Sequence, residues 1–317
     1  MRERILEILR DGSFVSGEAI AEELGISRTA VWKHIHSLKD LGYEIESIRN
    51  RGYRLVSSPD IPIAEEITRE LGTEIIGSEI EFFPTIDSTN ISGKEKARSR
   101  VSEGSVIVSE VQTRGRGRKQ RTWSSPKGGL WFSIVLYPEI PPERGMLVTM
   151  MASISVAEAV EEVAGIRPVI KWPNDLLVKG KKLCGILTEI DAEIDRIDSS
   201  VIGIGINVNN DIEPELMQTA TSLKIETGTK ISRVDLLRSI LVRMDVNYRS
   251  LKDKEHDMIR SRWMDRSNIR GRKIRHTGER GINIGKVIDI DGSGCLIIET
   301  EVGRERIVSG DVEYLDS

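Results

Sequence analysis

The sequence contains few cysteines and no long hydrophobic run. Its 317 residues include two cysteines, Cys184 and Cys295, which lack CxxC spacing, and this argues against a disulfide framework or a structural zinc site. No apolar run approaches the roughly 20 residues that a membrane helix needs. The opening residues, MRERILEILRDG, mix acidic with basic side chains, unlike a signal or transit peptide. These absences predict a cytoplasmic protein with free thiols.

A strong charge of one sign is also absent. The formal net charge is −4, so any surface for nucleic acid must be local. Hydrophobic residues make up 38% and charged residues 30% of the chain, a balance typical of globular proteins. Because 317 residues exceed what a single core usually supports, we expect two or three domains.

The first 58 residues have the pattern of a winged helix. Apolar residues recur at helical spacing over residues 2–10, and a second helix is expected to open at Ser16. Gly25 then turns the chain into a third helix over residues 28–41. Alternating apolar residues on both sides of Arg49-Asn50-Arg51-Gly52 predict a β-hairpin with a basic turn.

Charges in this region are sorted by position. Nine lysines and arginines balance nine acidic residues, but the acidic ones lie mostly on the first two expected helices. Six of the nine basic residues fall on the third helix and the wing, where a winged helix contacts the groove and the phosphates. DNA binding is therefore favoured over a winged helix used for protein contacts. The residues expected at DNA are Ser27, Arg28, Thr29, Lys33, Arg49 and Arg51.

Two further domains are expected after a linker near residues 57–62, which gives domains over 1–58, 62–268 and 271–317. The middle domain should hold a mixed or antiparallel sheet backed by helices. Its expected strands lie near 79–84, 105–112, 129–137, 167–171, 183–190 and 199–208, and its helices near 62–71, 89–101, 145–164, 232–251 and 255–265. From Gly271, short strands between Gly and Asp turns predict a small SH3-like β-barrel. The fold class is α+β.

Four segments of the middle domain carry residue types suited to ligand binding. They are Asp87-Ser88-Thr89-Asn90, the run from Gln112 through Trp123, Lys171-Trp172-Pro173-Asn174-Asp175 with Lys181-Lys182, and Gly203 to Val208. Taken singly, each has an ordinary structural explanation: a helix cap, a solvated or RNA-binding loop, a turn, or a strand interior. Neither a Walker loop nor a dinucleotide-binding glycine pattern is present.

The arginine-glycine loop is the most informative segment by its chemistry. Four arginines, Arg114, Arg116, Arg118 and Arg121, alternate with glycines in a short stretch. Glycine lets the backbone approach a ligand closely, and the guanidinium fork matches phosphate and carboxylate oxygens. The loop therefore predicts a ligand with several negative charges.

In this order and spacing the four segments resemble the catalytic domain of biotin protein ligases. With the winged helix in front, the whole chain resembles the bifunctional members that also repress the biotin operon. The resemblance implies a core similar to class II aminoacyl-tRNA synthetases and lipoate ligases. It also implies biotin and ATP as substrates, Mg²⁺, a biotin carboxyl carrier protein as acceptor, operator DNA, and a homodimer formed on adenylate binding.

The resemblance also assigns roles to individual residues. Lys182 and Arg118 are the implied catalytic residues, and Asp175 is implied, more weakly, for Mg²⁺. The implied biotin-binding residues are Ser88, Thr89, Asn90, Gln112, Arg116, Gly117, Arg118 and Lys182, and the implied nucleotide-binding residues are Arg118, Arg121, Trp123 and Asn207. Arg114 stands where the family commonly has a smaller residue, so closure of the loop can differ here.

Two alternatives remain open at this stage. A lipoate-type ligase of the same fold is expected to lack both the winged helix and the Ser88-Thr89-Asn90 set with Gln112. A biotin-sensing DNA-binding regulator with little ligase activity is the other alternative. Retention of Arg116, Arg118 and Lys182 argues against it.

Overall fold

The computed structural model of the chain describes residues 1–278 and 281–315. Its internal contacts separate two units, Met1–Ile61 and Pro62–Ser317. The break falls within the predicted linker near residues 57–62, whereas the C-terminal β-rich part shares one unit with the middle of the chain. A separate C-terminal domain starting at residue 271 stays a prediction.

The N-terminal unit is the predicted winged helix-turn-helix. It contains α1 (Arg2–Leu9), α2 (Gly17–Leu24), α3 (Arg28–Asp40) and the antiparallel hairpin of β1 (Glu44–Ile48) and β2 (Gly52–Ser57). Ser16 and Ser27 cap α2 and α3, since each hydroxyl accepts a bond from the backbone amide three residues on. Gly25 ends α2 at φ 65°, the left-handed conformation that the sharp turn requires.

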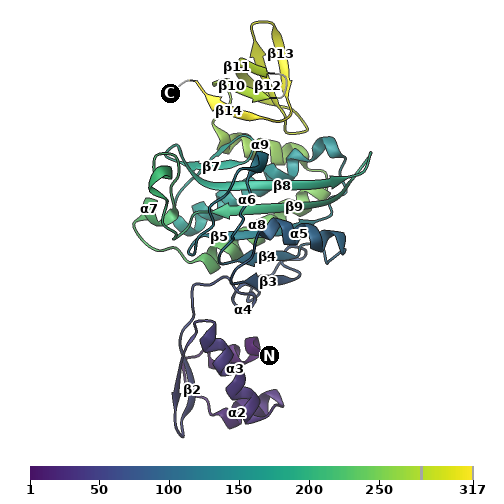
Figure 1. Ribbon diagram of the computed structural model, residues 1–317. Coiled ribbons are helices and arrows are strands. Elements are labelled where there is room, and N and C mark those ends of the chain that lie inside the picture. The colour runs from purple at the N-terminus through teal and green to yellow at the C-terminus, as the bar shows by residue number, and fades with distance from the viewer. Residues whose placement is uncertain (279–280, 316–317) are drawn as a thin grey trace. The chain divides into compact units, whose positions relative to one another are not determined.

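The second unit is built on a seven-stranded mixed sheet, as expected from the sequence (Figure 1). Its order is β3-β4-β5-β9-β8-β7-β6, with β3 and β4 parallel and every other pair antiparallel. The strands are β3 (Ile80–Phe83), β4 (Val106–Ser109), β5 (Leu130–Leu136), β6 (Val169–Lys171), β7 (Asp175–Val178), β8 (Lys181–Ala192) and β9 (Ile197–Ile206).

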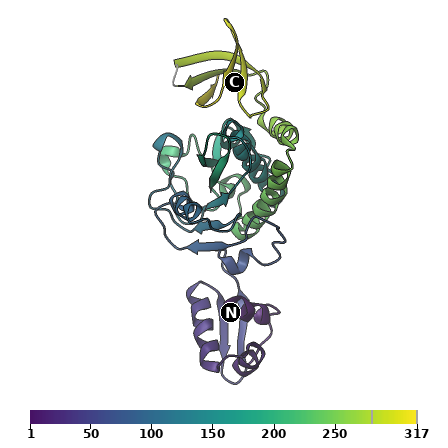
Figure 2. The same cartoon turned by 90° about the vertical axis from the view of Figure 1, so that its right-hand side faces the viewer.

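Helices cover the two faces of this sheet unequally. Figure 2 shows the green helices α8 and α9 along one side of the sheet and the blue α5 on the other. The large hydrophobic core lies under α6 and α8, whereas α5 packs on a small cluster around Val135 and Val201. The polar site described below therefore lies on the face with less helical cover. The helices are α4 (Ala64–Ile67), α5 (Thr89–Arg98), α6 (Met146–Ala164), α7 (Leu223–Thr227), α8 (Arg233–Lys252) and α9 (His256–Ser267).

The C-terminal part is β-rich, as predicted. It forms a five-stranded antiparallel sheet in the order β13-β12-β11-β10-β14. The strands are β10 (Lys273–Gly278), β11 (Gly281–Ile290), β12 (Leu296–Thr300), β13 (Gly303–Ile307) and β14 (Asp311–Tyr314). Its buried apolar residues, including Ile274 and Val312, belong to the same hydrophobic cluster as the core of the middle sheet.

Several boundaries expected from the sequence were wrong. The helix expected over 62–71 spans only Ala64–Ile67, because the Thr68 hydroxyl bonds back to the Ala64 carbonyl and Glu70 takes φ 57°. Strand β7 and helix α7 were not anticipated. Residues 172–174 do form the expected turn, but β7 begins at once after it and makes β6, β7 and β8 a meander.

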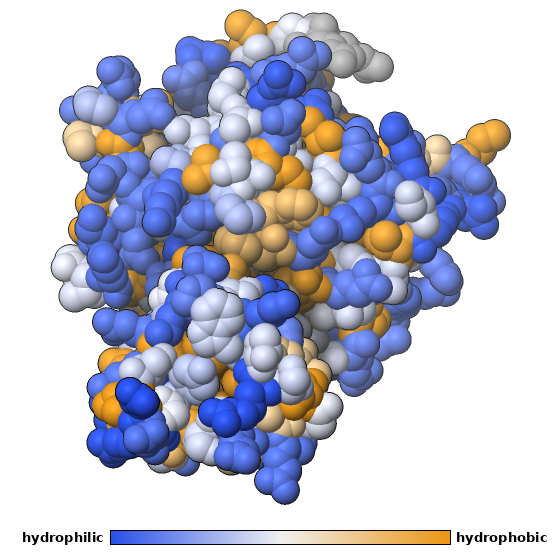
Figure 3. Space-filling model, turned by 60° about the horizontal axis from the view of Figure 1, so that its bottom comes forward, coloured by the Kyte–Doolittle hydropathy of each residue, from blue (hydrophilic) through white to orange (hydrophobic). Residues whose placement is uncertain are grey.

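Surface and thiols agree with the composition. On the face drawn in Figure 3, hydrophilic residues predominate and hydrophobic ones are interspersed among them. Within residues 1–278 and 281–315, no helix is long and apolar enough to cross a membrane. Cys184 and Cys295 are both free and buried, and burial raises the pKa of each thiol.

Candidate active site

Paired glycines on two neighbouring strands form the floor of the candidate site. Gly185 of β8 pairs directly with Gly205 of β9. Gly203, two residues before Gly205, lies on the same face of β9. The Trp123 ring lies against this bare backbone. A Cβ on Gly205 would come 2.5 Å from Trp123 Nε1, and one on Gly185 would come 2.9 Å from Trp123 Cζ3. Glycine at both positions is thus what lets an aromatic ring rest on the sheet.

Trp123 is placed to receive a flat ligand. Its ring meets Trp131 edge to face, with centroids 6.4 Å apart and an interplanar angle of 72°. Lys182 Nζ lies 5.1 Å from the Trp123 ring centroid. An indole that packs against a tryptophan, a cation and the sheet is suited to stacking on a purine. The contact of Trp123 with adenine stays a prediction.

Gln112 and the start of α5 form a polar wall beside the floor. Gln112 Oε1 accepts a bond from the Thr89 backbone amide at 2.9 Å, and its Nε2 donates to Ser125 Oγ at 2.8 Å. Ser88 occupies the N-cap position of α5, yet its side chain makes no capping bond. Helix capping therefore does not account for the serine here, and its predicted contact with biotin stays open.

Asn90 is held by bonds to the protein at both ends of its amide. Its Nδ2 donates to the Leu187 carbonyl at 3.2 Å and to Glu189 Oε2 at 3.0 Å, while Oδ1 accepts from Ser133 Oγ at 2.6 Å. Gly203 makes room for it, because a Cβ there would lie 1.8 Å from Asn90 Oδ1. In this arrangement Asn90 positions the wall, and direct contact with a ligand stays a prediction.

Sequence reasoning missed Ser133 and Glu189, which complete this network. The Ser133 hydroxyl lies 2.7 Å from Thr89 Oγ1 and is fully buried, and Glu189 also pairs with Lys94 at 3.2 Å. Ser133 could have been noticed, because it is the one polar residue within the apolar strand LWFSIVL. Nothing in the sequence around Glu189 distinguishes it from a solvated strand residue.

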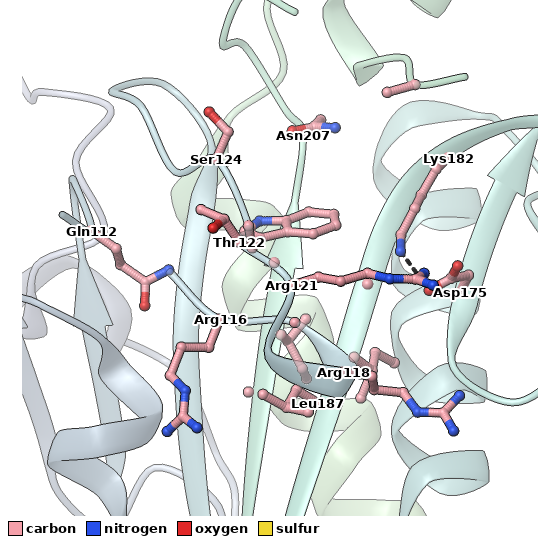
Figure 4. A pocket seen from close by; sticks show the side chains of 18 of the residues that line it. Gln112, Arg116, Arg118, Arg121, Thr122, Ser124, Asp175, Lys182, Leu187 and Asn207 are labelled. Carbon is pink, nitrogen blue, oxygen red and sulfur yellow. Dashed lines mark ion pairs between the residues drawn. The ribbon is translucent and has the colours of Figure 1, made fainter. Parts of the chain in front are cut away.

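A cationic and an acidic side chain form an ion pair beside the floor. Lys182 Nζ forms an ion pair with Asp175 Oδ1 at 2.8 Å, and the two side chains are 34% and 24% exposed. In Figure 4 this pair lies on one side of the pocket, while Gln112 and Arg116 lie on the other. The site therefore has a charged side and, opposite it, a neutral side of hydrogen-bonding groups, beside which the Arg116 cation lies 3.9 Å from the Glu189 carboxylate.

The arginine loop is tied to the charged side and to the C-terminal sheet. Arg118 Nη1 donates to Asn174 Oδ1 at 3.2 Å and to the Gly310 carbonyl at 3.3 Å. Burial lowers the pKa of Arg118, although a guanidinium stays protonated at neutral pH. Asp311 pairs with Arg121 at 3.0 Å and with Lys119 at 3.1 Å. These contacts hold several cations close together beside the floor.

All twelve residues predicted to bind biotin, nucleotide or metal line one pocket, a cavity of about 330 Å³. Asn207 lines it with its Oδ1 accepting a bond from Asn210, and its contact with a nucleotide stays a prediction. Sequence reasoning missed the rim residues after β9 and the contribution of Asp311, which no motif marks. The additional lining residues include Asn174, Asp211, Ile212, Glu213, Leu216, Thr219, Ala220 and Asp311.

Two residues of the segment after β9, Thr219 and Thr221, hold the backbone of Lys182 by hydrogen bonds. The Lys182 backbone amide donates to the Thr219 carbonyl at 2.8 Å, and the Lys182 carbonyl accepts from Thr221 at 3.0 Å. The neighbouring Lys181 instead directs its ammonium to the Met217 carbonyl at 2.7 Å. Of the two lysines, Lys182 therefore lines the pocket, and Lys181 bonds to the segment after β9.

Adding a methyl group to Gly203 should damage the neutral side of the pocket. Gly203→Ala must displace the Asn90 amide, so we expect weaker biotin binding and a loss of about 1–3 kcal/mol of stability, as for other overpacked sites. Calorimetric titration with biotin and thermal unfolding measure both. Gly292→Ala is the matched control, since a Cβ there meets nothing within 4 Å. Unchanged biotin affinity in Gly203→Ala would show that the Asn90 side of the pocket does not bind biotin.

The predicted DNA-contacting residues form an exposed group on the N-terminal unit. Ser27, Arg28, Thr29 and Lys33 are exposed on and before α3, and Arg49 and Arg51 are exposed at the wing turn. The Arg51 guanidinium lies 4.3 Å from the Phe14 ring centroid, which fixes its stem. Arg54, also basic, is already paired with Glu46 at 2.6 Å.

Three family models match separate segments of the chain. The model of the Biotin/lipoate A/B protein ligase family matches residues 82–207, an HTH domain model matches residues 2–54, and the Biotin protein ligase C terminal domain matches residues 271–314. The Bifunctional ligase/repressor BirA of Bacillus subtilis is 40% identical over 319 aligned residues, which cover 99% of this chain and 98% of that protein.

Two further relatives agree. The Bifunctional ligase/repressor BirA of Escherichia coli is 29% identical, with 94% of this chain and 92% of that protein covered. A solved structure of the biotin protein ligase from Aquifex aeolicus in complex with biotin and ATP superimposes with a TM-score of 0.66 at 31% identity, over 76% of this chain and all of that one. This chain belongs to the biotin protein ligase family, in the branch whose members carry a helix-turn-helix domain in front of the ligase.

Proposed function

We propose that this protein activates biotin with ATP as biotinyl-adenylate and transfers the biotin to a lysine of a biotin carboxyl carrier protein. The observation that carries the proposal is that one pocket gathers every residue predicted to bind biotin, nucleotide or metal, with a neutral side and a charged side that holds Lys182 and Arg118. A urea ring suits the neutral side, because short hydroxyl and amide groups satisfy its two N–H donors and its carbonyl. A triphosphate suits the cations.

The reaction follows from placing two anions beside Lys182. A biotin carboxylate oxygen forms a bond to the α-phosphorus while the bond to pyrophosphate breaks. The Lys182 ammonium and the arginine loop reduce the repulsion between the two anions and stabilise the charge that develops. A carrier lysine then attacks the mixed anhydride, loses a proton and releases AMP. The loop excludes water from the anhydride between these steps.

We propose that Mg²⁺ arrives with ATP. Bound to the phosphates it would neutralise their charge, as Mg²⁺ does when one or two carboxylates and several phosphate oxygens hold it. Asp175 offers one carboxylate in the pocket. In the described part of the chain no group of three metal-binding side chains exists, which fits an ion carried mainly by the nucleotide.

Loss of Arg118 should make the intermediate escape. Arg118→Gly removes the bonds to Asn174 and the Gly310 carbonyl, so the loop should hold biotinyl-adenylate less firmly. We expect bystander lysines, for instance on added albumin, to become biotinylated, as a streptavidin blot would detect. Arg114→Gly is the matched control, since Arg114 lies outside the pocket with a side chain 78% exposed. Labelling confined to the carrier lysine in Arg118→Gly would refute the closing role.

The winged helix favours a second activity, repression of biotin genes in response to biotin. Its exposed basic residues lie on the helix and wing where groove and phosphates are met, and full-length relatives are named as ligase/repressors. A protein that uses ATP and binds operator DNA would work in the cytoplasm. A regulator without ligase activity would not need the Lys182 and arginine arrangement, and a lipoate-type ligase would not need the winged helix.

Transfer to a carrier domain tests the proposal. The protein is incubated with biotin, ATP, Mg²⁺ and a biotin carboxyl carrier domain, and the mass of the carrier is measured. We expect one biotin on one lysine, absent when that lysine is replaced by arginine. An unmodified carrier would leave the chain without its proposed transferase activity.

A further inference from the structure

Trp32 is the one large aromatic residue that α3 presents to solvent, and no part of the proposed ligase chemistry uses it. Its side chain is 52% exposed, whereas the apolar residues of α3 that face the core, such as Val31 and Ile35, are almost fully buried. An exposed indole in the middle of a helix leaves a large apolar surface in water. A ligand that covered this surface would gain binding free energy from the burial of apolar area.

The ring is held in a fixed place. Trp32 stacks on His36, one turn later, with ring centroids 4.7 Å apart and an interplanar angle of 25°. Residues three or four apart share a helix face, so Thr29 lies on the face of Trp32, and Lys33 lies beside this face, four residues after Thr29 and three before His36. A stacked pair has less rotamer freedom to lose on binding than a free indole has.

The charge around the ring favours DNA as the occupant. Arg28 and Lys33 flank Trp32 and are exposed, and the helix carries its single carboxylate, Asp40, at the far end. Acidic protein surfaces would also match these cations. The helix, however, follows a helix-turn-helix turn and has a basic wing beside it, the arrangement that places the first half of such a helix in the major groove.

We propose that Trp32, backed by His36, reads thymine in the operator by packing against its 5-methyl group. This inference rests on the proposed DNA-binding function and adds a specificity residue to it. The thymine methyl is the apolar group that base pairs expose in the major groove, so it is the natural partner of an indole edge. Thr29 supplies a polar contact beside the indole, and Arg28 and Lys33 are attracted to the phosphates.

Replacing thymine by uracil tests the contact, because it removes only the methyl. The full-length protein, with biotin, ATP and Mg²⁺, is titrated against an operator duplex mapped by footprinting upstream of biotin genes, with uracil placed at each thymine in turn. We expect one or two positions per half-site at which uracil weakens binding about fourfold, the cost of one unburied methyl group. In Trp32→Ala, uracil at those same positions should have no further effect.

Lys33→Ala is the matched control on the same face. It should weaken thymine and uracil duplexes equally and reduce the salt dependence of binding. Circular dichroism and thermal unfolding check that Trp32→Ala keeps its fold, and Trp32→Phe should recover part of the thymine preference. Equal uracil effects in the wild type and Trp32→Ala overturn the inference and leave DNA binding intact. Altered self-association of Trp32→Ala with unchanged thymine preference overturns it in favour of a protein contact. Absence of sequence-specific binding by the wild type overturns both.

Discussion

Replacing Lys182 with alanine should lower the rate of biotinyl-adenylate formation by about 10²-fold or more, the scale of one preorganised electrostatic contact. Lys182 is the one of the two adjacent lysines whose ammonium enters the pocket, where it meets Asp175 at 2.8 Å and the Trp123 ring at 5.1 Å. Its backbone is fixed on both sides by bonds to residues 219 and 221. The cation is therefore in place before the two substrate anions arrive.

Lys181→Ala is the control for charge and composition. Lys181 sits one residue away on the same strand, but its ammonium bonds to the Met217 carbonyl and it does not line the pocket. We expect near wild-type adenylate formation in this variant, measured by biotin-dependent release of pyrophosphate. A Lys182→Ala enzyme as fast as Lys181→Ala would show that Lys182 is not the bridging cation.

Biotinyl-adenylate should raise the affinity of the protein for operator DNA by about 10²–10⁴-fold, through formation of a dimer. One winged helix contacts a single short half-site, and its domain has equal numbers of basic and acidic residues, so a monomer has only modest attraction to phosphates. Two linked copies make the second half-site contact effectively intramolecular. Linkage then requires that the factor by which adenylate strengthens dimerisation equals the factor by which dimerisation strengthens adenylate binding.

Analytical ultracentrifugation with and without adenylate, paired with DNA titrations in the same buffer, measures this coupling. Biotin alone and ATP alone are the controls, and both should leave the protein less associated than the adenylate does. Self-association that ignores the adenylate, or DNA binding without sequence preference in either state, would remove the repressor half and leave the ligase half standing.

Much of this architecture was accessible from sequence because it depends on local patterns. Gly25 and Ser27 predicted the helix-turn-helix through turn and cap chemistry that the structure confirms. The alternation of short apolar runs predicted the mixed sheet and the β-rich C-terminal part. Strand β7 was missed because its first residue, Asp175, was interpreted together with Pro173 and Asn174 as part of a turn.

The parts of the site that could not be predicted depend on long-range contacts. Asp311 reaches Arg121 across 190 residues of sequence, and Ser133 meets Asn90 across 43, so no local spacing marks either contact. The pairing of Gly185 with Gly205 is likewise a matter of strand register. The roles of the lining residues remain predictions until the substitutions above are measured.

Biotin-dependent exchange of labelled pyrophosphate into ATP measures formation of biotinyl-adenylate separately from its transfer. It requires the pocket to bind both substrates and to form and reverse the adenylate, with no acceptor protein. We expect rapid exchange with biotin, little with lipoate, and about 10²-fold slower exchange in Lys182→Ala than in Lys181→Ala. Absence of biotin-dependent exchange, or exchange that lipoate supports better than biotin, would contradict the proposed ligase function.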